Sequence, residues 1–151
     1  MRSLPAAAVL ALAALCCTPL AADPLGACKP DAAPPNATIG CLDNGRFQIE
    51  ATFIDTNNEA APVTRNAHVV PLVADGVYLW FYTADNPEVF VKVLDGCALS
   101  GTYWIFAAGL TNVDNTITVT DTLAHVTRTY HHAAGPAFQP TQDTAALPTC
   151  P

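Results

Sequence analysis

Histidines and turn aspartates are the side chains of this sequence best suited to hold a metal ion. Imidazole nitrogens suit transition metals, and carboxylate oxygens at strand ends suit calcium. His131 and His132 are adjacent, so on a strand they point to opposite faces and cannot both reach one ion. The aspartates lack the regular spacing of a calcium loop and are also common turn residues. We therefore expect no metal and no other cofactor. The residues concerned are His68, His125, His131, His132, Asp75, Asp85, Asp95, Asp114 and Asp121.

Nucleophilic catalysis finds little support in the composition. Beyond residue 22 the chain holds one serine, Ser100, in the sequence Leu-Ser-Gly. This context lacks the strained strand-to-helix turn that exposes a catalytic serine. A cysteine nucleophile would need a free thiol, and the even number of cysteines beyond residue 22 argues against one. We accordingly expect a protein that is not an enzyme.

Aromatic side chains are the remaining candidates for contact with a ligand. In strands most such residues belong to the core, but an exposed row of them could stack on a sugar ring or on a peptide. Exposure of Trp80 and Trp104 therefore decides between the two interpretations. Lys92 stands alone among apolar neighbours, which makes it a further candidate. The possible platform contains Tyr78, Trp80, Tyr82, Tyr103 and Trp104, and from it we select Tyr78, Trp80 and Trp104, together with Lys92, as binding residues.

Four cysteines lie beyond residue 22, and in an exported chain they predict two disulfide bonds with three possible connectivities. Pairing neighbours in sequence would join Cys28 to Cys41 and Cys97 to Cys150. Loop-closure entropy would then contribute about 3 and about 4 kcal/mol, respectively. A four-cysteine metal site is disfavoured because no two of these cysteines are separated by two residues.

Seven runs of residues predict the strands that must position these side chains. The clearest is 47–53, in which apolar and polar residues alternate. The run 77–82 is apolar on both faces, as in a central strand, whereas Pro71 predicts an edge strand or a bulge for 67–72. No helical period is present, so we expect an antiparallel β-sandwich, Ig-like in the broad sense, of about seven strands; a small closed β-barrel is the alternative. The other predicted strands are 89–94, 103–106, 116–120 and 126–130.

The N-terminal segment resembles a secretory leader. Arg2 precedes an apolar run from Leu4 to Leu15 and a small-residue cleavage site at 20–22. The run is too short to span a membrane. We therefore predict a signal peptide over residues 1–22 and a secreted or periplasmic protein. The sequence Leu-Gly-Ala before Cys28 also resembles a lipoprotein cleavage site, so a lipid anchor at Cys28 is an alternative.

The rest of the chain divides into three predicted parts. Residues 23–43 form a proline-rich lead-in, 44–131 the sandwich, and 132–151 a C-terminal tail tied down by a disulfide. Six Lys and Arg against thirteen Asp and Glu give a net charge of −7. An acidic surface of this kind disfavours binding to nucleic acid or to anionic membranes.

Several blocks of the sequence, in order, resemble those of a group of exported bacterial β-sandwich domains, most of them uncharacterised. The blocks are NGRF at 44–47, VKVLDG at 91–96, YWIF at 103–106 and TVTDT at 118–122. The resemblance implies location and architecture and carries no activity. Some members have the first cysteine pair without the second, which favours pairing of neighbours in sequence.

Taken together, these features predict a secreted, non-enzymatic module that acts by surface recognition of an unknown protein or carbohydrate. A small metal-binding protein or enzyme that uses the histidines and turn aspartates is one alternative. An inhibitor of a secreted enzyme is another, because small disulfide-tied exported domains can have that role.

Overall fold

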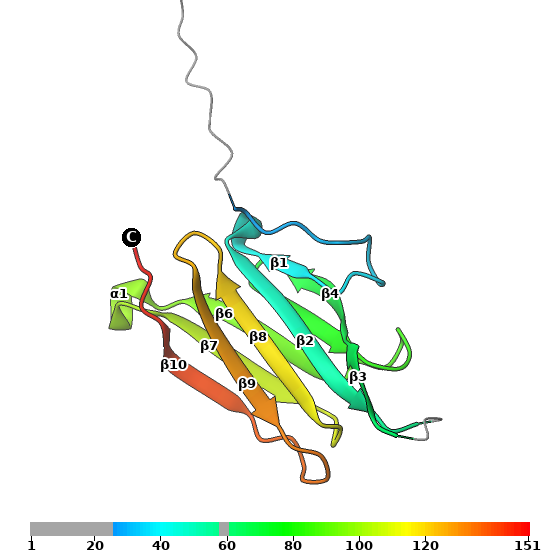
Figure 1. The fold of residues 1–151 in the computed structure, drawn as a ribbon. Helices are drawn as coiled ribbons and strands as arrows, with labels where there is room; N and C mark the ends of the chain where they lie inside the picture. The colour runs from blue at the N-terminus through cyan, green and yellow to red at the C-terminus, as the bar shows by residue number, and fades with distance from the viewer. Residues whose placement is uncertain (1–25, 58–60) are drawn as a thin grey trace, which may run out of the picture.

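Two antiparallel sheets of five strands each pack face to face in the computed structural model, which describes residues 26–57 and 61–151 (Figure 1). The predicted signal peptide lies outside the described residues. Sheet A contains β1 (Gly40–Leu42), β2 (Phe47–Asp55), β3 (Val63–Asn66), β8 (Asn115–Asp121) and β9 (Val126–His132). Sheet B contains β4 (His68–Val73), β5 (Gly76–Trp80), β6 (Val89–Asp95), β7 (Tyr103–Gly109) and β10 (Thr141–Leu147).

The strand order confirms a sandwich, and the closed-barrel alternative is wrong. Sheet A runs β1-β2-β8-β9, with β3 paired to the far part of β2, and sheet B runs β10-β7-β6-β5-β4. A short 3-10 turn, η1 (Asp43–Gly45), follows β1, and one helical turn, α1 (Cys97–Ser100), joins β6 to β7.

Each of the seven predicted strands is present. In β2 the apolar residues Phe47, Ile49, Ala51 and Phe53 are all buried, and the residues between them are partly exposed. This alternation is what a strand produces when one face lies on a core and the other in water. Pro71 lies on β4, an edge strand whose pairing with β5 is irregular between Pro71 and Val73, as predicted.

Three further strands were not predicted, and they correct the boundaries of the sandwich. β1 lies within the predicted lead-in, β3 between the first two predicted strands, and β10 within the predicted tail. The sequence TQDTAAL of β10 has no apolar alternation, so the strand could not be predicted from it. Pairing with β7 and burial of Ala146 and Leu147 hold this strand in place. The sandwich therefore extends from Gly40 to Leu147.

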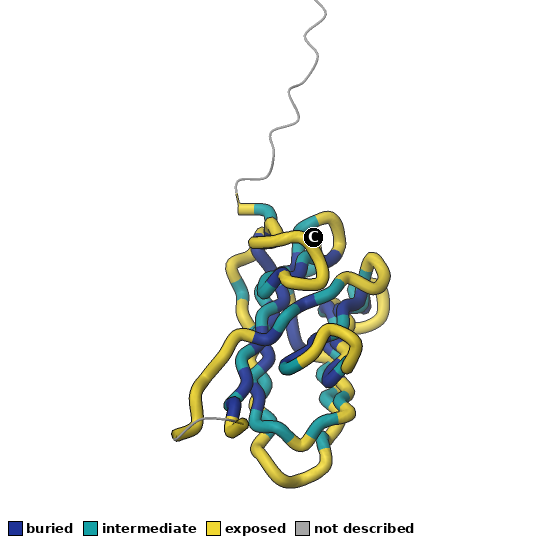
Figure 2. Tube along the Cα trace, turned by 90° about the vertical axis from the view of Figure 1, so that its right-hand side faces the viewer, coloured by how far each residue is buried: buried dark blue, intermediate teal, exposed yellow. Residues whose placement is uncertain are grey.

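The core lies between the sheets, where Figure 2 shows the buried stretches of chain gathered inside an exposed outer surface. Ile49, Ile117 and Val119 of sheet A are fully buried, as are Val91 and Ile105 of sheet B. Such side chains contribute about 1.5–3 kcal/mol each when buried, which makes the sheet-to-sheet contact the main source of stability.

Both disulfides follow the pairing of neighbours in sequence: Cys28 bonds Cys41, and Cys97 bonds Cys150. The first fastens the lead-in to β1, and the second fastens the end of the chain to α1. With this bond in place, Cys28 has no free sulfur for a lipid anchor. The disulfides are consistent with an oxidising, extracytoplasmic compartment. Among the described residues no helix is long and apolar enough to cross a membrane.

Candidate functional site

The outer face of sheet B carries a cluster of aromatic side chains. Along β6, Val89, Val91 and Val93 point into the core, so Phe90 and Lys92 point outward and are exposed. Along β7, Trp104 and Phe106 alternate in the same way with buried neighbours. Tyr78 is the partly exposed residue of β5. We call these five outward residues, Tyr78, Phe90, Lys92, Trp104 and Phe106, the aromatic face.

Strand register places these side chains side by side. Phe90 lies opposite Tyr78, with ring centroids 6.2 Å apart, and Lys92 lies opposite Phe106. Phe106 in turn lies opposite Gln142 of β10. Because neighbouring strands are about 4.8 Å apart, one row across the sheet presents an ammonium, a phenyl ring and an amide within about 10 Å.

Trp104 is held in a defined orientation at one end of the aromatic face. Its Nε1 donates a hydrogen bond to Ser100 Oγ at 2.7 Å, and its indole lies against Gly96, where a Cβ would collide with it. Its ring centroid is 6.3 Å from that of Phe106, in an edge-to-face arrangement. The single serine beyond residue 22 therefore orients an aromatic ring.

Trp80 belongs to the same face but is unavailable to a ligand. It is only 9% exposed. The His68 ring stacks on its indole with centroids 3.9 Å apart, and its Nε1 donates to the Pro35 carbonyl of the lead-in. We therefore correct the candidate set by removing Trp80, whereas Tyr78, Lys92 and Trp104 do lie on one face.

Two other aromatic residues of the predicted platform also lie elsewhere. Tyr103 is 6% exposed and packs in the core, with its ring 4.9 Å from that of Phe47. Tyr82 follows the end of β5 and packs edge-on against Phe53. Tyr103 is buried and Tyr82 is partly buried against the core, so both aromatic residues have a structural role.

A shallow apolar groove of about 270 Å³ crosses the aromatic face beside β10. Phe90, Phe106 and Ala108 form one part of it, and Pro140 forms part of its wall. Lys92, Thr141 and Gln142 also line the groove. It is therefore an apolar recess bordered by three side chains that can donate hydrogen bonds.

The outer face of sheet A has a different character. Thr120 lies opposite Thr127, and Thr118 opposite Thr129. The neighbouring residues of β2 on this face include Glu50 and Thr52. Small polar side chains of this kind are what a solvated outer face of an antiparallel sheet carries. The aromatic face of sheet B is therefore the unusual one.

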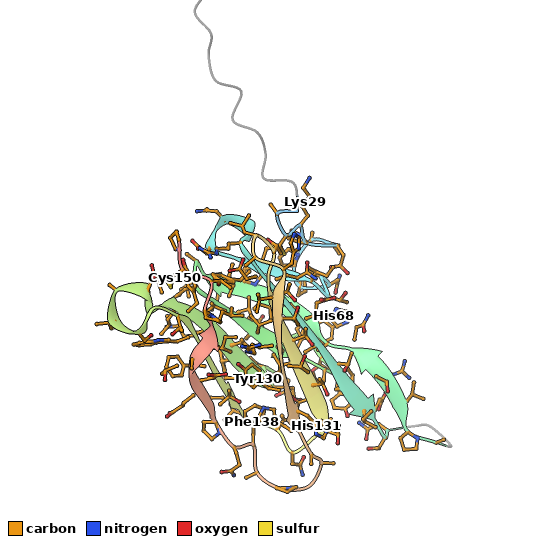
Figure 3. The ribbon with its side chains drawn as sticks, turned by 60° about the vertical axis from the view of Figure 1, so that its left-hand side comes forward. Lys29, His68, Tyr130, His131, Phe138 and Cys150 are labelled. Atoms are coloured by element: carbon orange, nitrogen blue, oxygen red, sulfur yellow. A yellow bond between two sulfur atoms is a disulfide. The ribbon has the colours of Figure 1, made fainter. Side chains whose placement is uncertain are left out.

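The histidines and turn aspartates do not converge. Within residues 26–57 and 61–151, no group of three His, Cys, Asp or Glu side chains could hold a metal ion. His131 Nε2 is 3.0 Å from Asp114 Oδ1, and His132 stacks on Phe138 with centroids 3.7 Å apart. Burial, with a contribution from His131, lowers the pKa of His132. Figure 3 shows His68 well away from His131 and Phe138.

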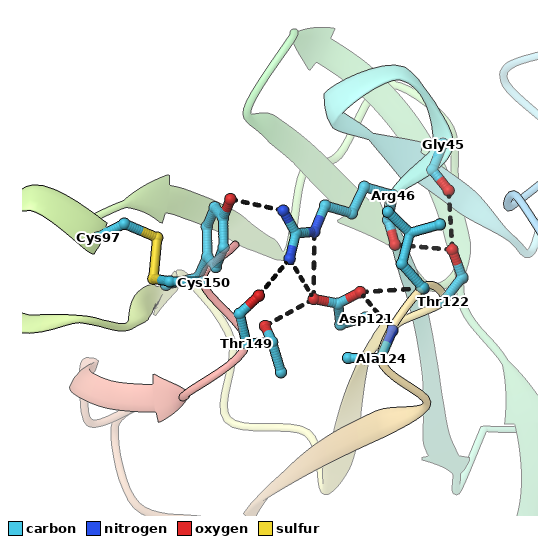
Figure 4. Close-up of polar contacts among 10 residues, drawn as sticks. Gly45, Arg46, Cys97, Asp121, Thr122, Ala124, Thr149 and Cys150 are labelled. Carbon is cyan, nitrogen blue, oxygen red and sulfur yellow. Dashed lines mark hydrogen bonds and ion pairs between the residues drawn. A yellow bond between two sulfur atoms is a disulfide. The ribbon is translucent and has the colours of Figure 1, made fainter. Parts of the chain in front are cut away.

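A buried ionic cluster, which the sequence did not reveal, closes one end of the sandwich (Figure 4). Arg46 donates to Asp121 Oδ2 through Nε at 3.2 Å and Nη2 at 3.0 Å, and also to Tyr103 Oη and the Thr149 carbonyl. Thr149 Oγ1 donates to the same carboxylate oxygen at 2.6 Å. Every strong donor in this cluster has a protein partner, which assigns it a structural role.

The pKa of Asp121 reflects this environment. Burial raises the pKa, but hydrogen bonds from Thr149, Arg46 and the Ala124 amide together outweigh burial, so the pKa lies below its usual range. Asp121 Oδ1 also accepts from the Leu123 amide, which is the turn role expected of aspartate. The carboxylate therefore remains charged at neutral pH.

No family model, curated protein or solved structure matches this chain. The resemblance of its sequence blocks to exported bacterial domains stays a prediction.

Three members of the candidate site escaped selection from the sequence: Phe90, Phe106 and Gln142. The signal for the first two was present, since Phe90 and Lys92 share one parity along β6, as do Trp104 and Phe106 along β7. Gln142 gave no signal, because it joins the face only through the pairing of β10 with β7.

Proposed function

We propose that this protein is a secreted recognition module that binds a partner on the aromatic face of sheet B. One observation carries the proposal: an outward sheet surface bears four aromatic side chains and one lysine, where the opposite sheet bears threonines. Exposed apolar surface on a folded domain is a liability for solubility and commonly marks an interaction site.

The side chains of this face are suited to binding. Phe90 is 37% exposed, and Tyr78, Trp104 and Phe106 are partly exposed. Aromatic residues bury large areas at little conformational cost, at about 25 cal/mol per Å² of apolar surface removed from water. Clusters of this kind dominate the energy of many protein interfaces.

The scaffold beneath the face supports the same function. β5, β6 and β7 are interior strands of sheet B, and each is hydrogen-bonded on both sides. The Cys97–Cys150 bond and the Ser100–Trp104 hydrogen bond further restrain one end of the face. A rigid surface loses little entropy on binding, so more of the contact energy is retained as affinity.

Affinity capture with matched variants tests the proposal. The immobilised domain is exposed to secreted proteins and glycans of its source, and captured molecules are identified by mass spectrometry. The double variant Phe90→Thr/Phe106→Thr removes two of the four aromatic side chains of the face while keeping good strand formers. The control variant, Thr118→Val/Thr129→Val, alters the outer face of sheet A.

We expect a captured partner that is lost with the first variant and kept with the control. The partner is then purified and its dissociation constant measured with all three proteins. Equal binding to all three would overturn the proposal. Turnover of a substrate by the purified domain, abolished by one side-chain change, would replace it with an enzymatic function.

A further inference from the structure

The side chains that line the groove on the aromatic face favour an apolar ligand over a sugar. Its floor consists of the Phe90 and Phe106 rings and Ala108, which offer no hydrogen-bonding side-chain groups. Of the side chains that line the groove, only those of Lys92, Thr141 and Gln142 can donate hydrogen bonds. A sugar placed there would bury hydroxyl groups without partners, at about 1–3 kcal/mol for each group. An apolar side chain would enter without that cost.

Lys92 supplies a positive charge next to this apolar floor. Among the described strand residues on the outer face of sheet B, Lys92 is the one Lys, Arg, Asp or Glu. Its Nζ is 3.7 Å from Asp75 Oδ2, and the two side chains are 50% and 42% exposed. An exposed pair at this separation contributes little, so a carboxylate from a partner can replace Asp75.

The preference for a carboxylate rests on the local charge of Lys92. The net charge of the chain is −7, which opposes the long-range approach of a strongly acidic protein. A single carboxylate next to an apolar side chain can still pair with Lys92 where the lysine borders the apolar groove. Complementary charge of this kind fixes orientation and excludes other partners.

We propose that the aromatic face binds a polypeptide segment in which a large apolar side chain is adjacent to a carboxylate. The apolar side chain occupies the groove over Phe106, and the carboxylate pairs with Lys92 Nζ. This inference rests on the proposed function and specifies its partner: an acidic, apolar segment of a protein.

Capped tetrapeptides provide the probe. One carries phenylalanine beside glutamate, and two matched peptides carry glutamine or lysine in place of glutamate. Backbone amide resonances of the ¹⁵N-labelled, disulfide-bonded domain are followed during titration. We expect shifts confined to β5, β6, β7 and β10, with affinity about five-fold higher for the glutamate peptide than for the glutamine peptide.

Two variants separate the contributions of charge and groove. Lys92→Gln is expected to remove the preference for glutamate over glutamine while retaining binding of the glutamine peptide. Phe106→Thr is expected to weaken both peptides at least ten-fold. Lys29→Gln, at an exposed lysine of the lead-in (Figure 3), is the control and should leave both affinities unchanged.

Three results would overturn the inference: no shifts on sheet B, equal affinity for the glutamate and glutamine peptides, or tighter binding of polygalacturonate than of any peptide through Lys92. These results leave the proposed function intact if the captured partner still requires Phe90 and Phe106. Equal capture of the partner by the original protein and both variants would, by contrast, overturn both the proposed function and this inference.

Discussion

Asp121 has a fully buried side chain and accepts hydrogen bonds from three segments of the chain: from Arg46, from Thr149 and from the turn after β8. Removing one partner of a buried ion pair leaves the other charge without compensation. We expect Asp121→Ala to lower the free energy of unfolding by about 3–5 kcal/mol. Urea denaturation of the oxidised protein measures it.

The exposed pair of Lys92 and Asp75 is the matched control for that prediction. Its charges are already solvated, so Asp75→Ala should change the free energy of unfolding by less than about 1 kcal/mol. Similar losses for Asp75→Ala and Asp121→Ala would show that burial does not determine the strength of the cluster.

Asp31 offers a second prediction at the scale of single residues. The hydrogen bond from the Thr38 hydroxyl is the main cause that lowers the pKa of Asp31 to about 2; burial opposes it, and the Ile39 and Thr38 amides add to the lowering. Thr38→Val removes the strongest donor and should raise the pKa toward the ordinary value of 3.8. An NMR titration of the Asp31 carboxyl carbon measures this. Thr129→Val, on the outer face of sheet A, should leave it unchanged.

Contacts between residues far apart in sequence could not be predicted from the residues themselves, both in the ionic cluster and around the candidate binding residues. Lys92 was selected because it stands alone among apolar neighbours, and Trp104 because it is an aromatic residue of a predicted strand; the structure places both on one face. Trp80 was selected on the same ground as Trp104, yet the lead-in covers it. Arg46 and Asp121 are 75 residues apart in sequence, and only the pairing of β2 with β8 brings them together.

At the scale of elements, β10 depends on bonds outside its own sequence. It pairs with β7 at one edge of sheet B, and the Cys97–Cys150 bond closes a span of 53 residues around it. We expect Cys97→Ser/Cys150→Ser to lower stability by about 4 kcal/mol and to reduce the hydrogen-exchange protection of Thr141–Leu147 most strongly.

The other disulfide provides the comparison. Cys28→Ser/Cys41→Ser opens a span of only 13 residues, so we expect a loss of about 3 kcal/mol and faster exchange in the lead-in, with β10 still protected. Loss of protection in β10 for both variants would contradict the assignment of one disulfide to each end of the chain.

Strand prediction succeeded wherever one side chain in two had to be buried. That condition holds for β2, β6 and β8, whose burial alternates strictly along most of their length. It fails for β1, β3 and β10, because β1 is short, β3 is exposed throughout, and β10 is buried only at its end. Strands of this kind form because a neighbouring strand offers hydrogen bonds. The sequence of one segment does not indicate which strand it will pair with.

For the whole molecule, the lowered pKa values predict sensitivity to acid. Hydrogen bonds from the Asn57 amide and Arg65 lower the pKa of Asp55, as other bonds do for Asp31 and Asp121. A carboxyl group with a lowered pKa in the folded state stabilises it above the ordinary pKa and loses that effect as the pH falls.

We therefore expect the free energy of unfolding to decline from about pH 4 toward pH 2. A smaller decline is expected below about pH 6.5, because the lowered pKa of His132 lets the unfolded state bind a proton that the folded state does not. Urea denaturation across this range measures it, and Asp121→Asn should show a shallower decline. Unchanged stability down to pH 2 would contradict this account.

The two tryptophans have different surroundings, so the fluorescence of Trp104 can report on binding at the aromatic face. Trp80 lies beneath the lead-in, whereas Trp104 lies partly open on the aromatic face. A soluble quencher such as iodide should therefore reach the Trp104 indole and leave Trp80 emission largely unaffected. A bound partner would shield Trp104, so occupancy of the face can be followed by fluorescence on the unlabelled protein.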